Sequence, residues 1–135
     1  MALKYVIYQQ KRKGGNNLFY GRAVHSDTIT LSSIADRVQR NCSMKKSDVL
    51  AVLTEMVETM QDELHNSNKV KIDGLGTFYL SIKSSGAITQ DEYNANENVK
   101  GIRVNFLAEG KKNNGTMSRT FTNGVKIVKA TGSVK

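Results

Sequence analysis

A chain of 135 residues with a net charge of +8, no Pro and one Cys has the length of one domain. Apolar residues make up 39% of it and recur regularly, which excludes a disordered or collagen-like protein. A single Cys excludes an intrachain disulfide, and no apolar run has the length of a signal peptide or a membrane span. We therefore expect an intracellular protein in which Cys42 is a small buried hydrophobe.

The positive charge lies toward both ends of the chain. Residues 1–40 carry seven basic against two acidic residues, a net charge of +5. Residues 41–83 carry five against six, and residues 84–135 carry eight against four, giving −1 and +4. Such ends suit a polyanionic partner, because Lys and Arg release counterions from phosphates. The alternative is a cationic protein that is merely soluble.

The first expected element is a β-hairpin. Residues 3–10 and 17–24 are rich in aromatic and β-branched residues, and the intervening KRKGGNN suits a turn. The basic tip at 11–13 is most simply a solvated turn. The aromatic residues of the hairpin either stack on bases or, as we prefer, cover a sheet face or a dimer neighbour. They are Tyr5, Tyr8, Phe19 and Tyr20.

Two helices are expected next. Residues 28–42 have apolar residues at helical spacing, with Thr30 as N-cap. Residues 43–69 show the strongest periodicity, with Ser43 or Ser47 as cap and Asp48 near the start. The apolar stripe is wide for so small a chain, so we expect part of it to contact a second subunit. It comprises Val49, Val52, Leu53, Met56, Val57, Met60 and Leu64.

Two glycines, Gly74 and Gly76, separate two short β-runs in KVKIDGLGTFYLSIK (69–83). A dinucleotide-binding loop needs G-x-G-x-x-G between a strand and a helix, but here Tyr79 takes the third position and a strand follows. The pair instead predicts a sharp corner that requires positive φ or close backbone approach. The sequence therefore assigns both glycines a structural role.

The remaining elements are strands and loops. Residues 84–100 are polar and are expected to form a loop, and residues 101–107 alternate like a strand with Ile102, Val104 and Phe106 inward. Residues 109–119 contain two Gly and two Asn and are a poor helix. Residues 124–130 predict a short strand that pairs with the N-terminal hairpin.

No catalytic or metal site is expected. His25 and His65 have no metal-ligand spacing to each other or to Cys42. The acids of the long helix form an ordinary solvated face, and nothing resembles a nucleophile with a positioned base. The sequence predicts no enzyme, no metal and no cofactor.

The segment KVKIDGLGTFYL (69–80) resembles the signature of HU and integration host factor, the bacterial histone-like proteins, which reads roughly V-x-L-x-G-F-G-x-F-x-V. KKSDV (45–49) resembles the family's entry to its second helix, and FLAEGK (106–111) resembles F-x-P-G-K with one extra residue and no Pro. The match covers about 80 of the 135 residues. Six residues fall on the signature, with Leu75 at the usual Phe: Val70, Ile72, Gly74, Gly76, Phe78 and Leu80.

The resemblance implies an α+β, HU-like fold. A two-helix body and a three-stranded β-saddle form an intertwined homodimer, and β-ribbon arms enter the DNA minor groove. We expect an N-terminal hairpin extension at 1–27, an HU-like domain at 28–112 and a segment with a short strand at 113–135. These additions resemble a divergent HU-related branch. The dimer or core residues are then Leu53, Met56, Val57, Met60, Leu64, Phe78 and Phe106.

The chain departs from the family in the arm. The family's R-x-R-x-x-R run is represented by Ser81, Lys83 and Gly86, so one cation of three remains. Without a Pro at the tip, a sharp kink of the duplex loses its usual cause. The arm region also holds three acids, which repel phosphate: Asp91, Glu92 and Glu97.

DNA contacts are expected from cations on or beside the saddle strands and at the start of the long helix, although each could also be a solvated surface cation. They are Lys83, Lys100, Arg103, Lys111, Lys112, Lys45 and Lys46. The resemblance thus implies a cytoplasmic, nucleoid-associated protein that binds duplex DNA with low specificity, with weak or no kinking. A second hypothesis is an HU-fold scaffold whose acidic arm and added strands bind proteins. A third is RNA or single-strand binding by the hairpin. No membrane partner is expected.

Overall fold

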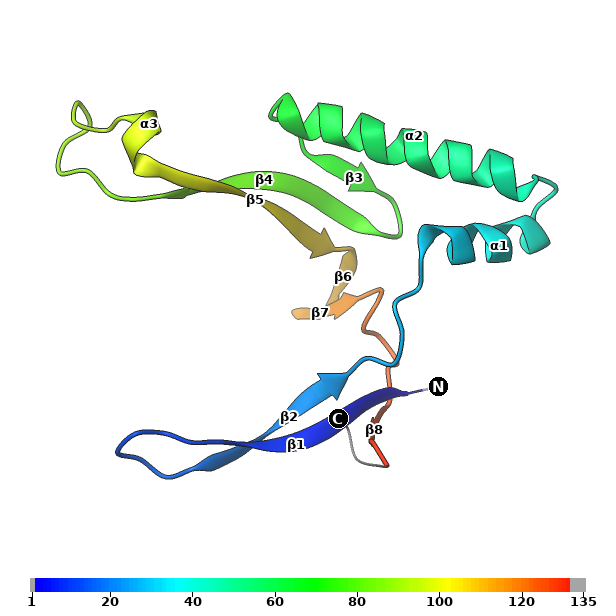
Figure 1. Cartoon of the computed structure of the whole chain (residues 1–135), viewed down its shortest axis with the longest axis horizontal. Helices are drawn as coiled ribbons and strands as arrows, with labels where there is room; N and C mark the ends of the chain where they lie inside the picture. The colour runs from blue at the N-terminus through cyan, green and yellow to red at the C-terminus, as the bar shows by residue number, and fades with distance from the viewer. Residues whose placement is uncertain (1, 132–135) are drawn as a thin grey trace. The chain divides into compact units, whose positions relative to one another are not determined.

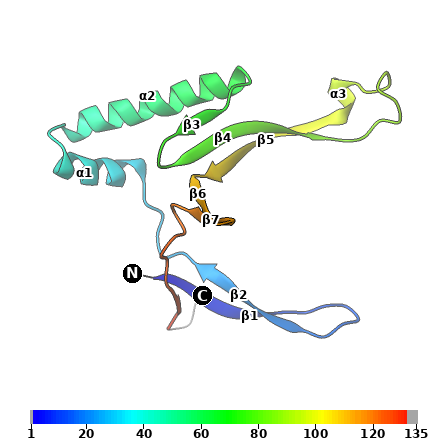
Figure 2. The same cartoon turned by 180° about the vertical axis from the view of Figure 1, so that it is seen from behind.

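The structure is a computed structural model that describes residues 2–131, and the chain divides into two compact units. One unit contains the N-terminal part of the chain up to Ile34 together with the segment from Gly124 onward. The other contains Ala35–Asn123. Helices and several small sheets make this an α+β protein (Figures 1 and 2). The expected boundaries after residues 27 and 112 stay a prediction.

The first unit is built on the N-terminal hairpin. Strands β1 (Leu3–Gln10) and β2 (Leu18–Val24) pair antiparallel, with Tyr8 opposite Tyr20. Strand β8 (Ile127–Lys129) joins β1 in parallel, which gives the order β2-β1-β8. Both the hairpin and the pairing of the terminal strand are confirmed, although β8 is shorter than expected.

Two helices, α1 (Leu31–Asn41) and α2 (Lys46–His65), lie at the predicted places. Thr30 caps α1, because its hydroxyl accepts the backbone N–H of Ser33 at 3.3 Å. Helix α2 begins after Lys45 without a side-chain cap, so the expectation of a cap at Ser43 or Ser47 was wrong. Asp48 lies in the first turn, where its negative charge interacts favourably with the positive end of the helix dipole.

The turn between the helices is fixed through Lys46. Its ammonium lies 3.0 Å from a carboxylate oxygen of Asp36, and its backbone N–H donates to the side-chain oxygen of Gln39 at 3.0 Å. These contacts tie the start of α2 to α1. At the other end, α2 ends at His65 and Asn66 is its C-cap residue.

A three-stranded antiparallel sheet follows, in the order β3 (Val70–Ile72), β4 (Gly76–Ser84), β5 (Val99–Ala108). Between β4 and β5 the chain forms a short helix, α3 (Ala95–Asn98), where we expected only a loop. The physical reason is local: the side chain of Asn94 accepts the backbone N–H of Asn96 and caps the turn. The strand register shifts between Lys83 and Ser84.

The glycine corner joins β3 to β4 as predicted. Gly74 has φ of 81°, which a residue with a side chain rarely adopts. At Gly76, with φ of 149°, a Cβ would collide with the backbone oxygen of Leu107 and the ring of Phe106. One glycine is therefore required for conformation and the other mainly for close approach of β5.

Residues 109–119 do not form a helix, as the sequence indicates, but they form a hairpin that was not predicted. Strand β6 (Gly110–Asn113) pairs antiparallel with β7 (Thr116–Arg119). The turn residues Asn114 and Gly115 both have positive φ, 48° and 83°. Asn-Gly is the favoured pair for a two-residue hairpin turn, so the signal was present in the sequence.

The second unit buries little by itself. Ala35 and Val49 are the buried apolar residues among those described. The β5 side chains expected to face inward are largely exposed: Ile102 by 71%, Val104 by 65% and Phe106 by 47%. Cys42 is also exposed, contrary to expectation, because it follows the last residue of α1. No helix in residues 2–131 is long and apolar enough to cross a membrane.

Candidate nucleic-acid interface

The β3-β4-β5 sheet has one apolar and one polar face. Successive side chains of a strand point to opposite sides of the sheet. The register places most apolar residues of β4 opposite apolar residues of β5, and most polar residues opposite polar ones. Phe78 lies opposite Phe106, with ring centroids 4.8 Å apart, on the apolar face. The polar face is formed by Lys71, Thr77, Tyr79, Ser81, Lys83, Arg103 and Asn105.

Lys83 and Arg103 share this polar face. Arg103 lies opposite Ser81, two residues before Lys83, so the two cations are diagonal neighbours across β4 and β5. Both are exposed, and neither forms a salt bridge with a described residue. Two guanidinium or ammonium groups without acidic partners produce a positive field on this face.

The polar face includes two cations that were not among the predicted DNA contacts. The ammonium of Lys69 lies 5.4 Å from the ring centroid of Tyr79. Lys71 lies opposite Thr77 and has Asp73 at 3.9 Å as a distant, exposed ion-pair partner. The alternation of residues 69–72 was the signal that could have placed Lys71 on this face.

The end of the sheet near the glycine corner is held by polar contacts to the β6–β7 segment. The guanidinium of Arg119 donates to the backbone oxygen of Ala108 at 2.7 Å, and the carboxylate of Glu109 accepts the backbone N–H of Gly74. Both side chains line a recess of about 200 Å³ together with Lys71. Arg119 thus joins the same edge of the polar face, and Glu109 partly offsets its charge.

The other predicted DNA-contacting cations are dispersed. Lys111 and Lys112 are exposed neighbours on β6, so they point to opposite sides of that hairpin. Lys100 donates to the backbone oxygen of Glu97 at 2.6 Å, beside the register shift. Lys45 is exposed at the start of α2, whereas Lys46 is paired with Asp36.

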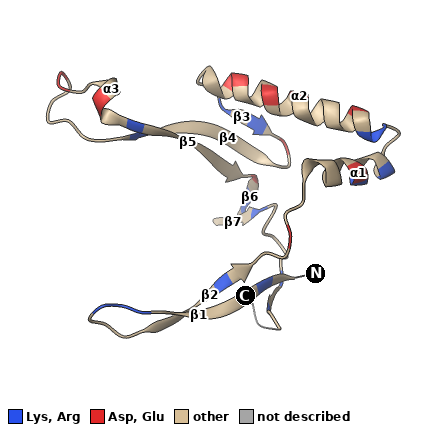
Figure 3. Cartoon of the chain, in the orientation of Figure 1, with Lys and Arg blue, Asp and Glu red and all other residues tan. Residues whose placement is uncertain are grey.

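Acidic residues gather at the far end of the β4–β5 ribbon (Figure 3). Asp91 and Glu92 lie in the loop, and Glu97 lies on α3. The ribbon end is organised by hydrogen bonds: the hydroxyls of Ser84 and Tyr93 lie 2.7 Å apart. The basic surface of the sheet therefore gives way to an acidic end.

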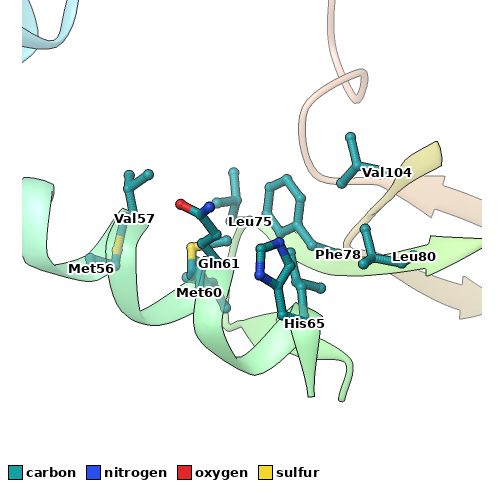
Figure 4. Close-up of a pocket in the computed structure, with 11 residues that line it drawn as sticks. Met56, Val57, Met60, Gln61, His65, Leu75, Phe78, Leu80 and Val104 are labelled. Carbon is teal, nitrogen blue, oxygen red and sulfur yellow. The ribbon is translucent and has the colours of Figure 1, made fainter. Parts of the chain in front are cut away.

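An apolar groove lies between α2 and the apolar face of the sheet (Figure 4). Its volume is about 460 Å³. Its wall contains five of the seven residues expected to form the dimer or core, and the other two are Leu53, which is half-buried, and Phe106. The groove is lined mainly by Met56, Val57, Met60, Leu64, Phe78, Leu80 and Val104.

Comparison with known proteins assigns the family. Residues 1–123 match a family described as an HU domain fused to a winged helix-turn-helix, Ig or glycine-rich motif, named HU-HIG. The chain belongs to the HU-HIG family. This confirms the resemblance to HU that the glycine corner indicated. HU proteins are a non-enzymatic family, so this HU-HIG chain is not an enzyme.

One relative supports the assignment, and one solved structure has a similar fold. DNA-binding protein HU of Thermus thermophilus is 33% identical over 51 residues, which cover 38% of this chain and 53% of that protein. A crystal structure from Bacteroides vulgatus, provisionally described as a bacterial DNA-binding protein, has a TM-score of 0.60 at 17% identity. That match covers 98% of this chain and 50% of the other. The HU-HIG chain thus spans about half the length of each relative.

Proposed function

We propose that this HU-HIG protein binds duplex DNA with low sequence preference, through the polar face of β3-β4-β5. The observation that carries the proposal is the pairing of Lys83 and Arg103 on a sheet face where neither has an acidic partner among the described residues. Lys71 extends the row toward the glycine corner. Flexible cations on a strand face contact phosphates without reading bases, which gives affinity with little specificity.

The binding unit is a homodimer. Val57 is 53% exposed and Val104 is 65% exposed, and both line the apolar groove between α2 and the sheet. Monomeric proteins rarely leave so much contiguous apolar surface in water. A second copy of the chain is the proposed occupant, because the apolar stripe of α2 and the apolar face of the sheet both stay exposed in one copy and can cover each other across a two-fold axis. The family resemblance supports the same arrangement.

The bound duplex is kinked weakly or not at all. The chain contains no Pro, so the ribbon lacks the wedge that HU-type arms insert between base steps. The acids at the ribbon end, Asp91, Glu92 and Glu97, further weaken contact with the minor groove. We propose that contact is concentrated on the sheet, with the protein acting in the bacterial nucleoid.

The phosphate contacts can be tested by measuring affinity for a labelled duplex of arbitrary sequence over a range of salt concentrations. The slope of log affinity against log salt is expected to fall by about 1 for each cation that no longer binds a phosphate. The double variant Lys83→Gln, Arg103→Gln is therefore expected to bind more weakly and with a shallower slope. A matched control is Arg37→Gln, Arg40→Gln, which removes two exposed cations from α1 of the same unit.

Equal weakening in both double variants would show that only net charge matters and would contradict the proposed face. Wild-type affinity in the sheet variant would overturn it as well. Size measurement by light scattering checks that the variants keep the oligomeric state of the wild type.

A second function is supported by the acidic ribbon end. Lys100 is the predicted DNA-contacting cation nearest to these acids in the sequence. Its ammonium donates to the backbone oxygen of Glu97. An acidic, ordered end suits a basic protein partner, and the added strands β1, β2 and β8 offer further surface. In this alternative the HU fold is a scaffold with reduced DNA binding. It predicts little change in partner binding when Lys83 and Arg103 are replaced by Gln.

A further inference from the structure

One face of the N-terminal sheet combines aromatic and basic side chains in a row. The β1–β2 register alternates side chains between the two faces and places Lys4, Tyr8, Tyr20 and Arg22 on the same one. We call these residues, together with Arg12 from the turn, the hairpin row. Lys4, Arg12 and Arg22 are exposed, and Tyr8 is 41% exposed.

The arginines of the hairpin row are held by the tyrosines. The guanidinium carbon of Arg22 lies 5.6 Å from the ring centroid of Tyr8, and the ring centroids of Tyr8 and Tyr20 are 6.1 Å apart. Arg12 donates from its guanidinium to the hydroxyl of Tyr20 at 3.2 Å. These contacts restrict both guanidinium groups while leaving N–H donors free, which lowers the entropy cost when an anion binds.

The row lies in a segment that is almost free of acids. Asp27 is the single acidic residue in 1–34 and 124–135, and it lies outside the strands. None of the basic residues of this unit forms a salt bridge with a described residue. The described ones are Lys4, Lys11, Arg12, Lys13, Arg22, Lys126 and Lys129 (Figure 3).

The opposite face of the sheet is different in character. It carries large exposed apolar side chains: Ile7 is 51% exposed, Phe19 is 69% exposed and Ile127 is 72% exposed. Lys129 is on this second face, opposite Tyr5 in the register. Arg22 and the two tyrosines that contact the arginines therefore lie on one face, which also carries the exposed side chains of Leu18 and Val128.

We propose that the hairpin row is a second DNA-binding surface, which contacts the phosphate backbone independently of the β3-β4-β5 face. It rests on the proposed function for the identity of its ligand. A linear row of fixed cations along a strand matches a linear polyanion, and guanidinium groups bind phosphate oxygens through two N–H donors. The contacts are to phosphate, since the exposed faces of both tyrosines are partly taken by each other and by Arg22.

The test uses the full chain with the double variant Arg12→Gln, Arg22→Gln and a labelled duplex of about 30 base pairs. The slope of log affinity against log salt is expected to fall by about 1 for each arginine that no longer binds a phosphate, with at least a roughly tenfold decrease in affinity at moderate salt. The charge-preserving Arg12→Lys, Arg22→Lys is expected to keep most of the slope. A matched control, Lys126→Gln, Lys129→Gln, removes two charges from the same unit and is expected to retain the wild-type slope.

The outcomes separate this inference from the proposed function. If Arg12→Gln, Arg22→Gln binds with the wild-type slope, or if the Lys126 and Lys129 control is weakened as much, the hairpin row is not a binding surface. The sheet variant Lys83→Gln, Arg103→Gln still tests the β3-β4-β5 face in that case. Weaker binding by the hairpin variant with wild-type binding by the sheet variant supports the hairpin row and overturns the proposed sheet face. Thermal unfolding of each variant identifies any decrease in DNA affinity that is caused by misfolding.

Discussion

The side-chain amide of Asn105 donates to the hydroxyl of Ser81 at 2.7 Å, across strands β4 and β5. The bond lies on the polar face, directly beside Arg103, which is the register partner of Ser81. An uncharged pair thus braces the strands at the point where the two proposed DNA-contacting cations project. This gives the polar face a fixed geometry without neutralising its charge.

Replacing Asn105 by Val is expected to weaken the contact between β4 and β5 without changing the charge of the polar face. Removal of one interstrand hydrogen bond should lower the free energy of unfolding by about 1 kcal/mol. Affinity for duplex DNA should fall only a few-fold, and the salt slope should stay at the wild-type value because no cation is removed. Urea unfolding and the salt titration measure the two effects. A slope as shallow as that of the Lys83→Gln, Arg103→Gln variant would contradict this division of roles.

The two corner glycines are expected to differ in their sensitivity to Ala. Gly76→Ala forces a Cβ into the backbone of β5 and should lower the free energy of unfolding by about 2–3 kcal/mol. At Gly74 the space is open and only the positive φ is unfavourable, so Gly74→Ala should cost about 1 kcal/mol.

Urea unfolding at a fixed protomer concentration measures both corner variants, since the stability of a dimer depends on concentration. Gly86→Ala serves as a control, because Gly86 has ordinary φ and open space around it. Equal effects at 74 and 76, or a larger one at 74, would contradict the close approach of β5 to the corner.

Val104→Glu is expected to abolish the proposed dimer. A carboxylate in the apolar groove would lose its hydration when the second copy packs there, without a partner to compensate. Light scattering should then report the mass of one chain or an aggregate. Ile88→Glu is the matched control, because Ile88 is 94% exposed in the ribbon loop and the same introduced carboxylate should leave the wild-type mass unchanged. A dimer that survives Val104→Glu would place the interface elsewhere.

Neutralising the ribbon acids is expected to strengthen DNA binding. The double variant Asp91→Asn, Glu92→Gln removes two charges that repel phosphate, so affinity should rise a few-fold at low salt and converge on the wild-type value at high salt. Glu55→Gln, Glu58→Gln on α2 is a control with the same change in net charge. If the control gains as much, the effect is one of net charge. If the ribbon variant gains nothing, the ribbon end lies away from DNA.

Much of the fold could be predicted from local signals. The period of α2, the alternation of β1 and β2 and the corner at Gly74 depend on residues close together in sequence. The α3 turn was missed because its cap at Asn94 lies within a polar stretch with no periodicity. The β6–β7 hairpin was missed although Asn114-Gly115 indicated it, since its strands lack the usual apolar alternation.

The site was less predictable because register decides it. The sequence identified Lys83 and Arg103 as candidates, but only the pairing of β4 with β5 makes them neighbours on one face. It also ranked Lys46 with them, whereas the ammonium is paired with Asp36. Whether a cation is free or engaged depends on residues that are distant in sequence, and charge counting does not contain that information.

The position of DNA on the polar face of β3-β4-β5 can be observed residue by residue. The experiment records backbone amide chemical shifts of the isotope-labelled protein while a duplex is added. We predict that, within residues 35–123, the largest changes occur at Lys71, Ser81, Lys83 and Arg103, and that they shrink as salt is raised. Changes confined to the solvated face of α2, around Glu55 and Glu58, or no changes on the sheet at DNA saturation, would contradict the proposed interface.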